Sequence, residues 1–541
     1  MNRYLFYGLL VLGIAMRVVL LARYELVNGG EVDVYLADEG IVGVMGMHIL
    51  AGRELPVFFY GQHYLGALEA YLAAASFAVF GVGFTSLRLV PLMFSLGLLG
   101  VVYDFTYRAY SVAAARWATV LLAVSPAYFL EWNLKARGGF VEHVFLLCLV
   151  MLLFWRFHLY HDRSRSLAIA LGLSAGIALW VNQLMLAYLI VLGGLLLFSG
   201  DRRWLGTVLA ALLVGSSLLI AYNVVHPLAT ARSLGRKAIV LNRVPIEDRD
   251  ESWVVRGVGK RVEALRHGAD KLGLVFGVPP REGVEKLGLT PEEREGSALT
   301  DVRRNLWFIP LLVFGVAFLA CRPRRGAGGW GPFASDQILG LLALVTFVVG
   351  YVSPRYMLPA YPLAAIMVGV LATRVDASRR TVMTAALAAV LGFNILGWVD
   401  NMVVRGGARD DRGERLLARL EAEGLTRCYS AAPLYHLVFE SEEGVVFSPL
   451  QKDRYPAYNA EVERAESICY VFRDDQRSKR QHVAMMRYLE DEGIAYSTAT
   501  SEPYRILYAF TPRKRLSGEA IARIRHQERA QVTHGRTGDS G

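Results

Sequence analysis

Long runs of apolar residues recur through the first 400 positions of this 541-residue chain. A helix of about 20 apolar residues crosses the roughly 30 Å hydrocarbon core of a bilayer. The chain is 54% hydrophobic and 20% charged, which excludes a string of ordinary soluble domains. We therefore expect a polytopic α-helical membrane protein with about eleven transmembrane helices. The expected spans are 4–22, 87–106, 113–130, 140–157, 166–182, 184–200, 204–222, 306–321, 335–352, 357–373 and 381–398.

The charges of the connecting loops predict the orientation. One set of short loops is rich in arginine, and such loops face the cytoplasm. These arginines are Arg108, Arg116, Arg156, Arg163, Arg165, Arg202, Arg203, Arg322, Arg324, Arg325, Arg374, Arg379 and Arg380. The alternate loops, 23–86, 131–139, 223–305 and 353–356, then lie outside. We expect the protein in the inner or plasma membrane, with its N-terminus in the cytoplasm. The net charge of +10 then reflects sidedness and gives no reason to expect a nucleic-acid partner.

One apolar stretch, 64–81, does not fit this alternation. If it crossed the membrane, every later basic loop would lie outside. It carries Glu69 and follows a second apolar helix expected at 41–50. We interpret both as interfacial helices in the first outer loop, and the alternative is that 64–81 crosses.

The composition changes near residue 401 to that of a soluble domain. Strand-like and helical segments alternate through 401–512, which predicts a small C-terminal α/β domain with a largely parallel sheet, outside the membrane. Cys428 and Cys469 both fall on expected strands and can pair only if those strands are neighbours. Small buried hydrophobic residues are the favoured interpretation. Residues 513–541 contain seven Lys or Arg and predict a flexible basic tail.

The first outer loop holds several unusual polar residues. Asp38 and Glu39 directly precede the expected helix 41–50, so they fit an N-terminal cap. A carboxylate fixed at a helix start at the membrane surface is also well placed to act as a general base. The following segment brings two glycines together with hydrogen-bonding groups ahead of an apolar helix. Its candidate substrate-binding residues are Tyr60, Gln62, His63, Tyr64 and Glu69, for which an aromatic anchor at the interface is the structural alternative.

The second outer loop carries positive charge against the general bias. Lys135 and Arg137 stand beside Gly138 and Gly139, a combination that suits phosphate oxygens. Snorkelling of the two long side chains is the alternative. Glu131 and Glu142 flank this segment, and Arg355 with Tyr356 stands at another outer boundary. The pairs Asn182-Gln183 and Tyr222-Asn223 fit interface caps. Histidines, cysteines and carboxylates form no metal motif of diagnostic spacing.

In this order and sidedness, the segments resemble the GT-C superfamily of integral-membrane glycosyltransferases. Residues 1–400 are similar to bacterial relatives of the dolichyl-phosphate-mannose protein mannosyltransferases (family 39) and the aminoarabinose lipid A transferases. The resemblance lies in Asp38-Glu39, in 60–66 leading into 68–72, in Arg88-Leu89 and in 355–359. Residues near Tyr435, 439–441 and 447–449 resemble the small outer domain of some bacterial members.

The resemblance implies an inverting transferase that uses a polyprenyl-phosphate-linked sugar and a hydroxyl acceptor: protein, lipid or cell-envelope glycan. Asp38 would act as the base with Glu39 assisting, and Arg137, Lys135 and Arg355 would bind the donor phosphate. The family often carries Asp in its second outer loop, where this chain has Glu131 and Glu142. The resemblance implies no organic cofactor. It leaves open whether a divalent metal ion is needed, because some relatives contain one.

Two other functions compete with this interpretation. A transporter or flippase for a lipid-linked glycan predicts inverted repeats and ionisable groups near the bilayer midplane, whereas the charges here gather at one interface. A non-enzymatic envelope-assembly protein would bind partners through the outer α/β domain, which leaves the outer charges unexplained.

Overall fold

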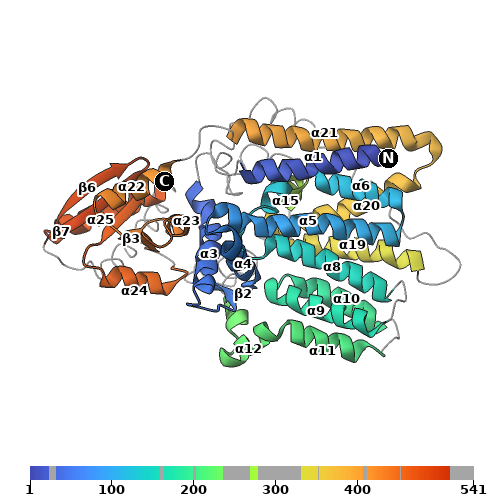
Figure 1. Cartoon of the computed structure of the whole chain (residues 1–541), viewed down its shortest axis with the longest axis horizontal. Coiled ribbons are helices and arrows are strands. Elements are labelled where there is room, and N and C mark those ends of the chain that lie inside the picture. Colours follow the sequence, from blue (N-terminus) through green and yellow to red (C-terminus); the bar gives the residue numbers. More distant parts are fainter. Residues whose placement is uncertain are drawn as a thin grey trace, which may run out of the picture. The chain divides into compact units, whose positions relative to one another are not determined.

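The computed structural model divides into two compact units (Figure 1). The helical unit comprises residues 1–27, 63–69 and 88–407, and the mixed unit comprises 28–62, 70–87 and 408–541. The structure describes residues 1–22, 32–158, 164–198, 203–234, 268–277, 331–350, 353–405, 411–450, 453–474 and 476–511.

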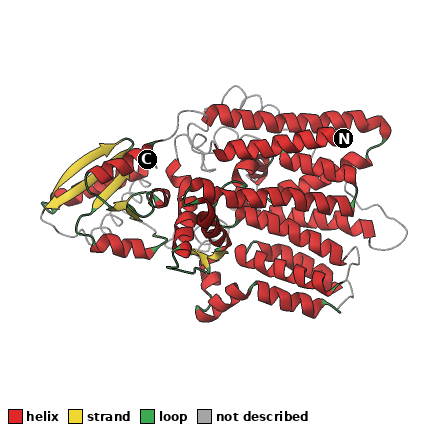
Figure 2. Ribbon diagram, in the orientation of Figure 1, coloured by secondary structure: helices red, strands yellow, loops and turns green. Residues whose placement is uncertain are grey.

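The helical unit is built from helices that run side by side (Figure 2). They are α1 (Arg3–Ala22), α5 (Phe84–Ala109), α6 (Val112–Ala123), α7 (Ala127–Trp132), α8 (Phe140–His158), α9 (Arg165–Val181), α10 (Met185–Phe198), α11 (Leu205–Gly215), α12 (Ser217–Val225), α15 (Gly268–Val275), α19 (Gly331–Gly350), η2 (Pro354–Met357), α20 (Ala360–Arg374) and α21 (Arg380–Arg405). Small residues let some of these helices approach closely, as at Gly176 of α9, where a Cβ would lie 2.2 Å from the Leu212 carbonyl oxygen of α11.

Helices lie within most of the expected spans. Helices occupy ten of the eleven expected spans, and the remaining one, 306–321, lies outside the described residues. Five helical segments are long and apolar enough to cross a bilayer, and α11 with α12 forms a sixth that bends by 61°. The chain is therefore a multi-pass membrane protein.

The expected span 113–130 is broken, which corrects the sequence analysis. α6 ends at Ala123 and α7 begins at Ala127, because Pro126 cannot continue a helix. The freed carbonyl groups at this break receive side-chain hydrogen bonds. Arg17 of α1 donates to Leu122 and Ala123, Tyr361 to Leu121, and Asn394 to Val124.

The first outer loop also differs from expectation. Helix α3 (Val32–Leu50) begins well before residue 41, so Asp38 and Glu39 lie inside the helix and do not cap it. The chain continues through β1 (Phe58–Phe59), β2 (Gln62–Gly66) and α4 (Leu68–Phe80). The segment expected as a helix from residue 64 therefore starts as a strand. The 13 residues of α4 span only about 20 Å, shorter than a bilayer core.

The C-terminal part of the mixed unit is an α/β layer. Its strands have the order β4-β3-β5-β7-β6. They are β3 (Arg427–Ser430), β4 (Val446–Pro449), β5 (Cys469–Arg473), β6 (Ala495–Ser501) and β7 (Tyr504–Thr511), with helices α22 (Arg412–Ala422), α23 (Tyr435–Glu440), α24 (Pro456–Arg464) and α25 (Gln476–Asp491). The β4-β3-β5 half is parallel as expected. The β5-β7-β6 half is antiparallel, because β6 and β7 follow each other directly as a hairpin.

The two strand cysteines are a further correction. Cys428 of β3 and Cys469 of β5 stand opposite each other in register, with their Cα atoms 4.4 Å apart. They form a disulfide, whereas the sequence analysis favoured two unpaired buried residues. The expected tail 513–541 lies outside the described residues.

Candidate active site

Two arginines from distant parts of the sequence share one group of aromatic rings in the helical unit. The guanidinium carbon of Arg137 lies 4.7 Å from the Trp132 ring centre, and that of Arg355 lies 5.5 Å from Phe140 and 5.2 Å from Tyr356. The ring of Phe140 contacts both other rings, edge-on to Trp132 at 5.5 Å and stacked on Tyr356 at 6.0 Å. We call these five residues the arginine–aromatic cluster.

The cluster is chemically suited to an anion. Stacking uses the faces of a guanidinium group, and its N–H donors lie in the plane, where they match the spacing of phosphate oxygens. Arg137 is almost completely buried, with 6% of its surface exposed. The alternative of snorkelling does not describe this side chain, because it is stacked on Trp132 inside the unit.

Lys135 is held in the same segment by an ion pair. Its ammonium group contacts the carboxylate of Glu131, one helical turn earlier, and both side chains are buried. Burial of a charge is costly unless a partner of opposite sign compensates. Glu131 therefore fixes the position of Lys135 two residues before Arg137.

A glycine turn connects this segment to the first outer loop. Gly138 and Gly139 have φ angles of 77° and 89°, a conformation that other residues rarely adopt. Their amides donate to one oxygen of Glu69, at 2.6 and 3.3 Å, and α8 begins at the next residue. Glu142, in the first turn of α8, is completely buried. The expected residues Glu69, Lys135 and Arg137 are thus brought into one region.

The second half of the 60–66 segment also joins the helical unit. The Nδ1 atom of His63 lies 2.9 Å from the Tyr222 hydroxyl, and the two rings stack. Leu65 forms an antiparallel bridge with Asn182, and Tyr64 is buried. The pairs at 182 and 222 that the sequence suggested as interface caps therefore support this loop.

In the mixed unit, Asp38 forms an ion pair with Arg454, an arginine for which the sequence gave no signal. The Asp38 Oδ1 and Arg454 Nη1 atoms are 2.8 Å apart. Glu39, the neighbouring residue, is completely buried. Tyr60 is buried too, and Gln62 is partly exposed at the start of β2.

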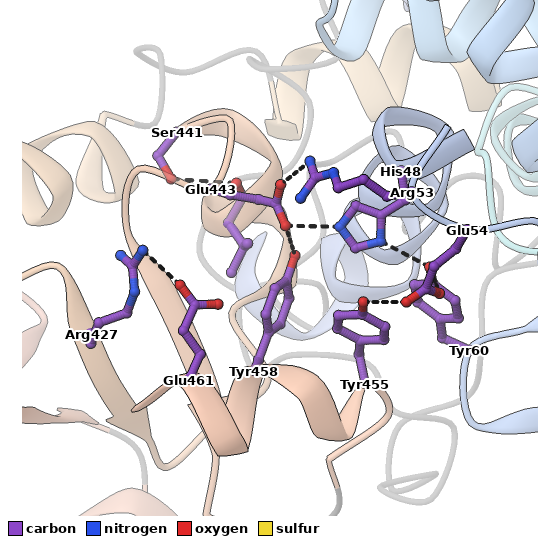
Figure 3. Close-up of polar contacts among 11 residues, drawn as sticks. His48, Arg53, Glu54, Tyr60, Arg427, Ser441, Glu443, Tyr455, Tyr458 and Glu461 are labelled. Carbon is purple, nitrogen blue, oxygen red and sulfur yellow. Dashed lines mark hydrogen bonds and ion pairs between the residues drawn. The ribbon is translucent and has the colours of Figure 1, made fainter. Parts of the chain in front are cut away.

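A network of polar residues surrounds Tyr60 (Figure 3). His48 bonds the Tyr60 hydroxyl through Nδ1 at 2.9 Å and Glu443 through Nε2 at 2.8 Å. The Tyr60 hydroxyl donates to Glu54 at 2.7 Å, so its oxygen accepts from His48.

The network shifts the protonation of its members. Burial raises the pKa of Glu443, but hydrogen bonds from His48, Arg53 and Tyr458 outweigh it and lower the pKa to about 2. Burial, together with nearby carboxylates, raises the pKa of Tyr60 and of Tyr458. The network therefore joins α3 to the C-terminal layer through an ionised carboxylate. These contacts could not be predicted from the sequence, because His48 and Arg53 lie about 400 positions before Glu443.

The expected site residues thus form two groups. The helical unit holds His63, Tyr64, Glu69, Glu131, Lys135, Arg137, Glu142, Arg355 and Tyr356. The mixed unit holds Asp38, Glu39, Tyr60 and Gln62. Among the described residues, no group of three or more His, Cys, Asp or Glu side chains is arranged to hold a metal ion.

Comparisons with known proteins agree with this architecture. Residues 67–226 match the family model of dolichyl-phosphate-mannose-protein mannosyltransferase. A comparison with curated proteins finds no match. Among solved structures, ArnT from Cupriavidus metallidurans in the apo state has a TM-score of 0.59 at 13% identity, covering 93% of this chain and 98% of that chain.

Two further structures are similar. ArnT bound to undecaprenyl phosphate has a TM-score of 0.58 at 13% identity, with coverage of 93% and 98%. The Archaeoglobus fulgidus oligosaccharyltransferase in complex with Zn and sulfate has a TM-score of 0.51 at 13% identity, with coverage of 93% and 72%. The chain thus has the GT-C fold, and its resemblance to membrane glycosyltransferases of the protein mannosyltransferase and ArnT type is confirmed.

Proposed function

We propose that the chain transfers a sugar from a polyprenyl-phosphate-linked donor to a hydroxyl acceptor, with inversion, at the outer face of the membrane. The observation that carries the proposal is the arginine–aromatic cluster within a GT-C fold. The ArnT structure with undecaprenyl phosphate supports the class of donor. The acceptor is a protein, a lipid or a cell-envelope glycan.

The cluster would act on the leaving group. When the bond between the anomeric carbon and the phosphate oxygen breaks, its electron pair leaves with the polyprenyl phosphate. Arg137 and Arg355 would bind that phosphate, and Lys135 would add positive charge beside them. Donors aimed at developing charge are commonly the largest catalytic contribution in such a site. The amides of Gly138 and Gly139 keep Glu69 ordered next to the same segment.

The carboxylates would act on the acceptor. Asp38 would take the proton of the acceptor hydroxyl as its oxygen bonds to the anomeric carbon. Glu39, buried on the same helix, would help to position Asp38. Glu131, Glu142, Tyr356 and the residues Tyr60, Gln62, His63, Tyr64 and Glu69 would shape the sites for the two substrates. No organic cofactor takes part, and transfer with and without a chelator tests for a divalent ion.

We further propose eleven membrane helices in the inner or plasma membrane, with the N-terminus in the cytoplasm and the C-terminal α/β layer outside. The alternating arginine-rich loops support this orientation. A reporter enzyme fused after residue 406 should be active outside the cell. Activity on the cytoplasmic side would contradict the orientation.

The direct test is transfer by the purified protein in liposomes that contain a polyprenyl-phosphate sugar. The wild type should form glycosylated acceptor and free polyprenyl phosphate, whereas Asp38→Asn should form neither while folding normally. Glu461→Gln, which removes a carboxylate of the C-terminal layer, is the matched control and should behave as wild type. Near-normal turnover by Asp38→Asn would contradict the assignment. Movement of intact donor between leaflets would instead indicate a flippase.

A further inference from the structure

Helix α3, which carries Asp38, packs directly against the C-terminal layer of the mixed unit. A Cβ atom at Gly40 would lie 2.2 Å from the backbone nitrogen of His436, and one at Gly43 would lie 2.5 Å from the Phe439 ring. The absence of a side chain lets α3 approach the α23 backbone at Gly40 and the Phe439 ring at Gly43. The helix that carries Asp38 is therefore packed closely against the C-terminal layer.

Arg454 approaches Asp38 from the loop before α24 and is held by several contacts. Its guanidinium carbon lies 5.6 Å above the Phe59 ring, and its backbone amide donates to the Tyr435 hydroxyl at 2.8 Å. That hydroxyl donates to Asp453 at 2.6 Å. The guanidinium group is thus held against Phe59, and the backbone of Arg454 is held by Tyr435.

The Asp38–Arg454 pair is only partly shielded, with 30% and 27% of the two side chains exposed. An ion pair with this exposure adds little to stability. It does hold the carboxylate in one orientation, with the Asp38 Oδ1 atom 2.8 Å from Arg454 Nη1. A general base needs such a fixed orientation before the acceptor binds.

We propose that Arg454 is a positioning residue for catalysis, by which the C-terminal layer orients the Asp38 carboxylate. One carboxylate oxygen binds Arg454, and the other accepts the proton of the acceptor hydroxyl. This inference rests on the proposed function and adds to it a catalytic role for the C-terminal domain.

The test compares steady-state transfer by Arg454→Ala, Arg454→Lys and wild type in liposomes. In Arg454→Ala, kcat should fall by about 10- to 100-fold with little change in KM for the donor, since misplacing a reacting group slows chemistry. Arg454→Lys, or guanidinium ion added to Arg454→Ala, should restore part of the rate.

Arg427→Ala is the matched control, because it removes a similarly exposed ion pair with Glu461 in the same layer. It should leave kcat and the KM for the donor unchanged. If Arg454→Ala keeps the wild-type kcat while Asp38→Asn is inactive, the positioning role is wrong and the proposed function stands. Activity of Asp38→Asn would instead contradict the role of Asp38 itself. A loss in Arg454→Ala that neither lysine nor guanidinium relieves would make Arg454 a purely structural residue.

Discussion

At the scale of single residues, the structure explains how cationic side chains can lie inside a largely apolar unit. Arg137 lies over the Trp132 ring, Arg355 lies against the rings of Phe140 and Tyr356, and Lys135 is paired with Glu131. Aromatic faces attract cations, and a carboxylate partner offsets the cost of burying an ammonium group. A polyprenyl phosphate would add the negative charge that such an arrangement favours.

Replacing Arg137 should weaken the binding of donor phosphate. A charge-assisted hydrogen bond contributes about 1.5–3 kcal/mol, so Arg137→Ala should raise the Kd for polyprenyl phosphate by about 10- to 100-fold. Arg137→Lys should recover only part of this, because an ammonium group lacks the planar fork. Arg108→Ala, which removes an exposed arginine paired with Asp104, is the control. Equal affinity of Arg137→Ala and wild type, measured in lipid nanodiscs, would exclude the phosphate role.

The lowered pKa of Glu443 makes the stability of the link between α3 and the C-terminal layer depend on pH. Its pKa is lowered from 4.5 to about 2 in the folded protein. The unfolded chain therefore binds this proton more readily, so the stabilisation is complete above about pH 4.5 and is lost as the pH falls toward 2. Glu443→Gln should lower the thermal midpoint at neutral pH and weaken its dependence on pH below 5. Glu442→Gln, at the exposed neighbouring position, should do neither. An unchanged pH dependence in Glu443→Gln would show that this carboxylate does not carry the effect.

At the scale of elements, the break between α6 and α7 illustrates what the sequence can and cannot predict. Pro126 is visible in the sequence and marks a place where a helix must end. The hydrogen bonds that make the break tolerable come from Arg17, Tyr361 and Asn394, on three other helices. Hydropathy alone cannot reveal such partners, so 113–130 was expected as one continuous span.

The start of α3 shows the same limit. Asp38-Glu39 before an apolar run has the signature of a helix cap, yet the helix extends back to Val32. The decisive contacts are tertiary: α3 packs on α23 and on the Arg454 loop, far along the chain. The alternation of strands and helices in the C-terminal layer was predicted, because alternation of short elements is a local signal.

The close packing of α3 on α23 should make Gly40 intolerant of any side chain. Gly40→Ala would place a Cβ against the backbone of His436, so we expect loss of folded protein or of transfer activity. Gly100→Ala on α5 is the control, since a Cβ there meets no atom within 4 Å and alanine favours a helix. Wild-type yield and activity in Gly40→Ala, measured by size-exclusion chromatography and transfer assay, would contradict the packing.

For the whole molecule, the sequence predicted a multi-pass membrane protein and the alternation of arginine-rich loops between its helices. The apolar runs and the alternating loops are local signals that need no knowledge of the fold. Three features depend on which segments become neighbours: the linked aromatic rings that Arg137 and Arg355 contact, the bond from Gly138 to Glu69 and the Cys428–Cys469 disulfide. Such pairings follow from tertiary structure and could not be read from a single sequence.

The proposed function depends most on the binding of polyprenyl phosphate by the arginine–aromatic cluster. The most direct measurement is a cryo-electron microscopy structure of the protein in nanodiscs saturated with polyprenyl phosphate. We predict density for the phosphate within hydrogen-bonding distance of the Arg137 and Arg355 guanidinium groups. A lipid phosphate bound elsewhere, with both arginines still stacked on Trp132 and Tyr356 and making no contact with it, would contradict the claim.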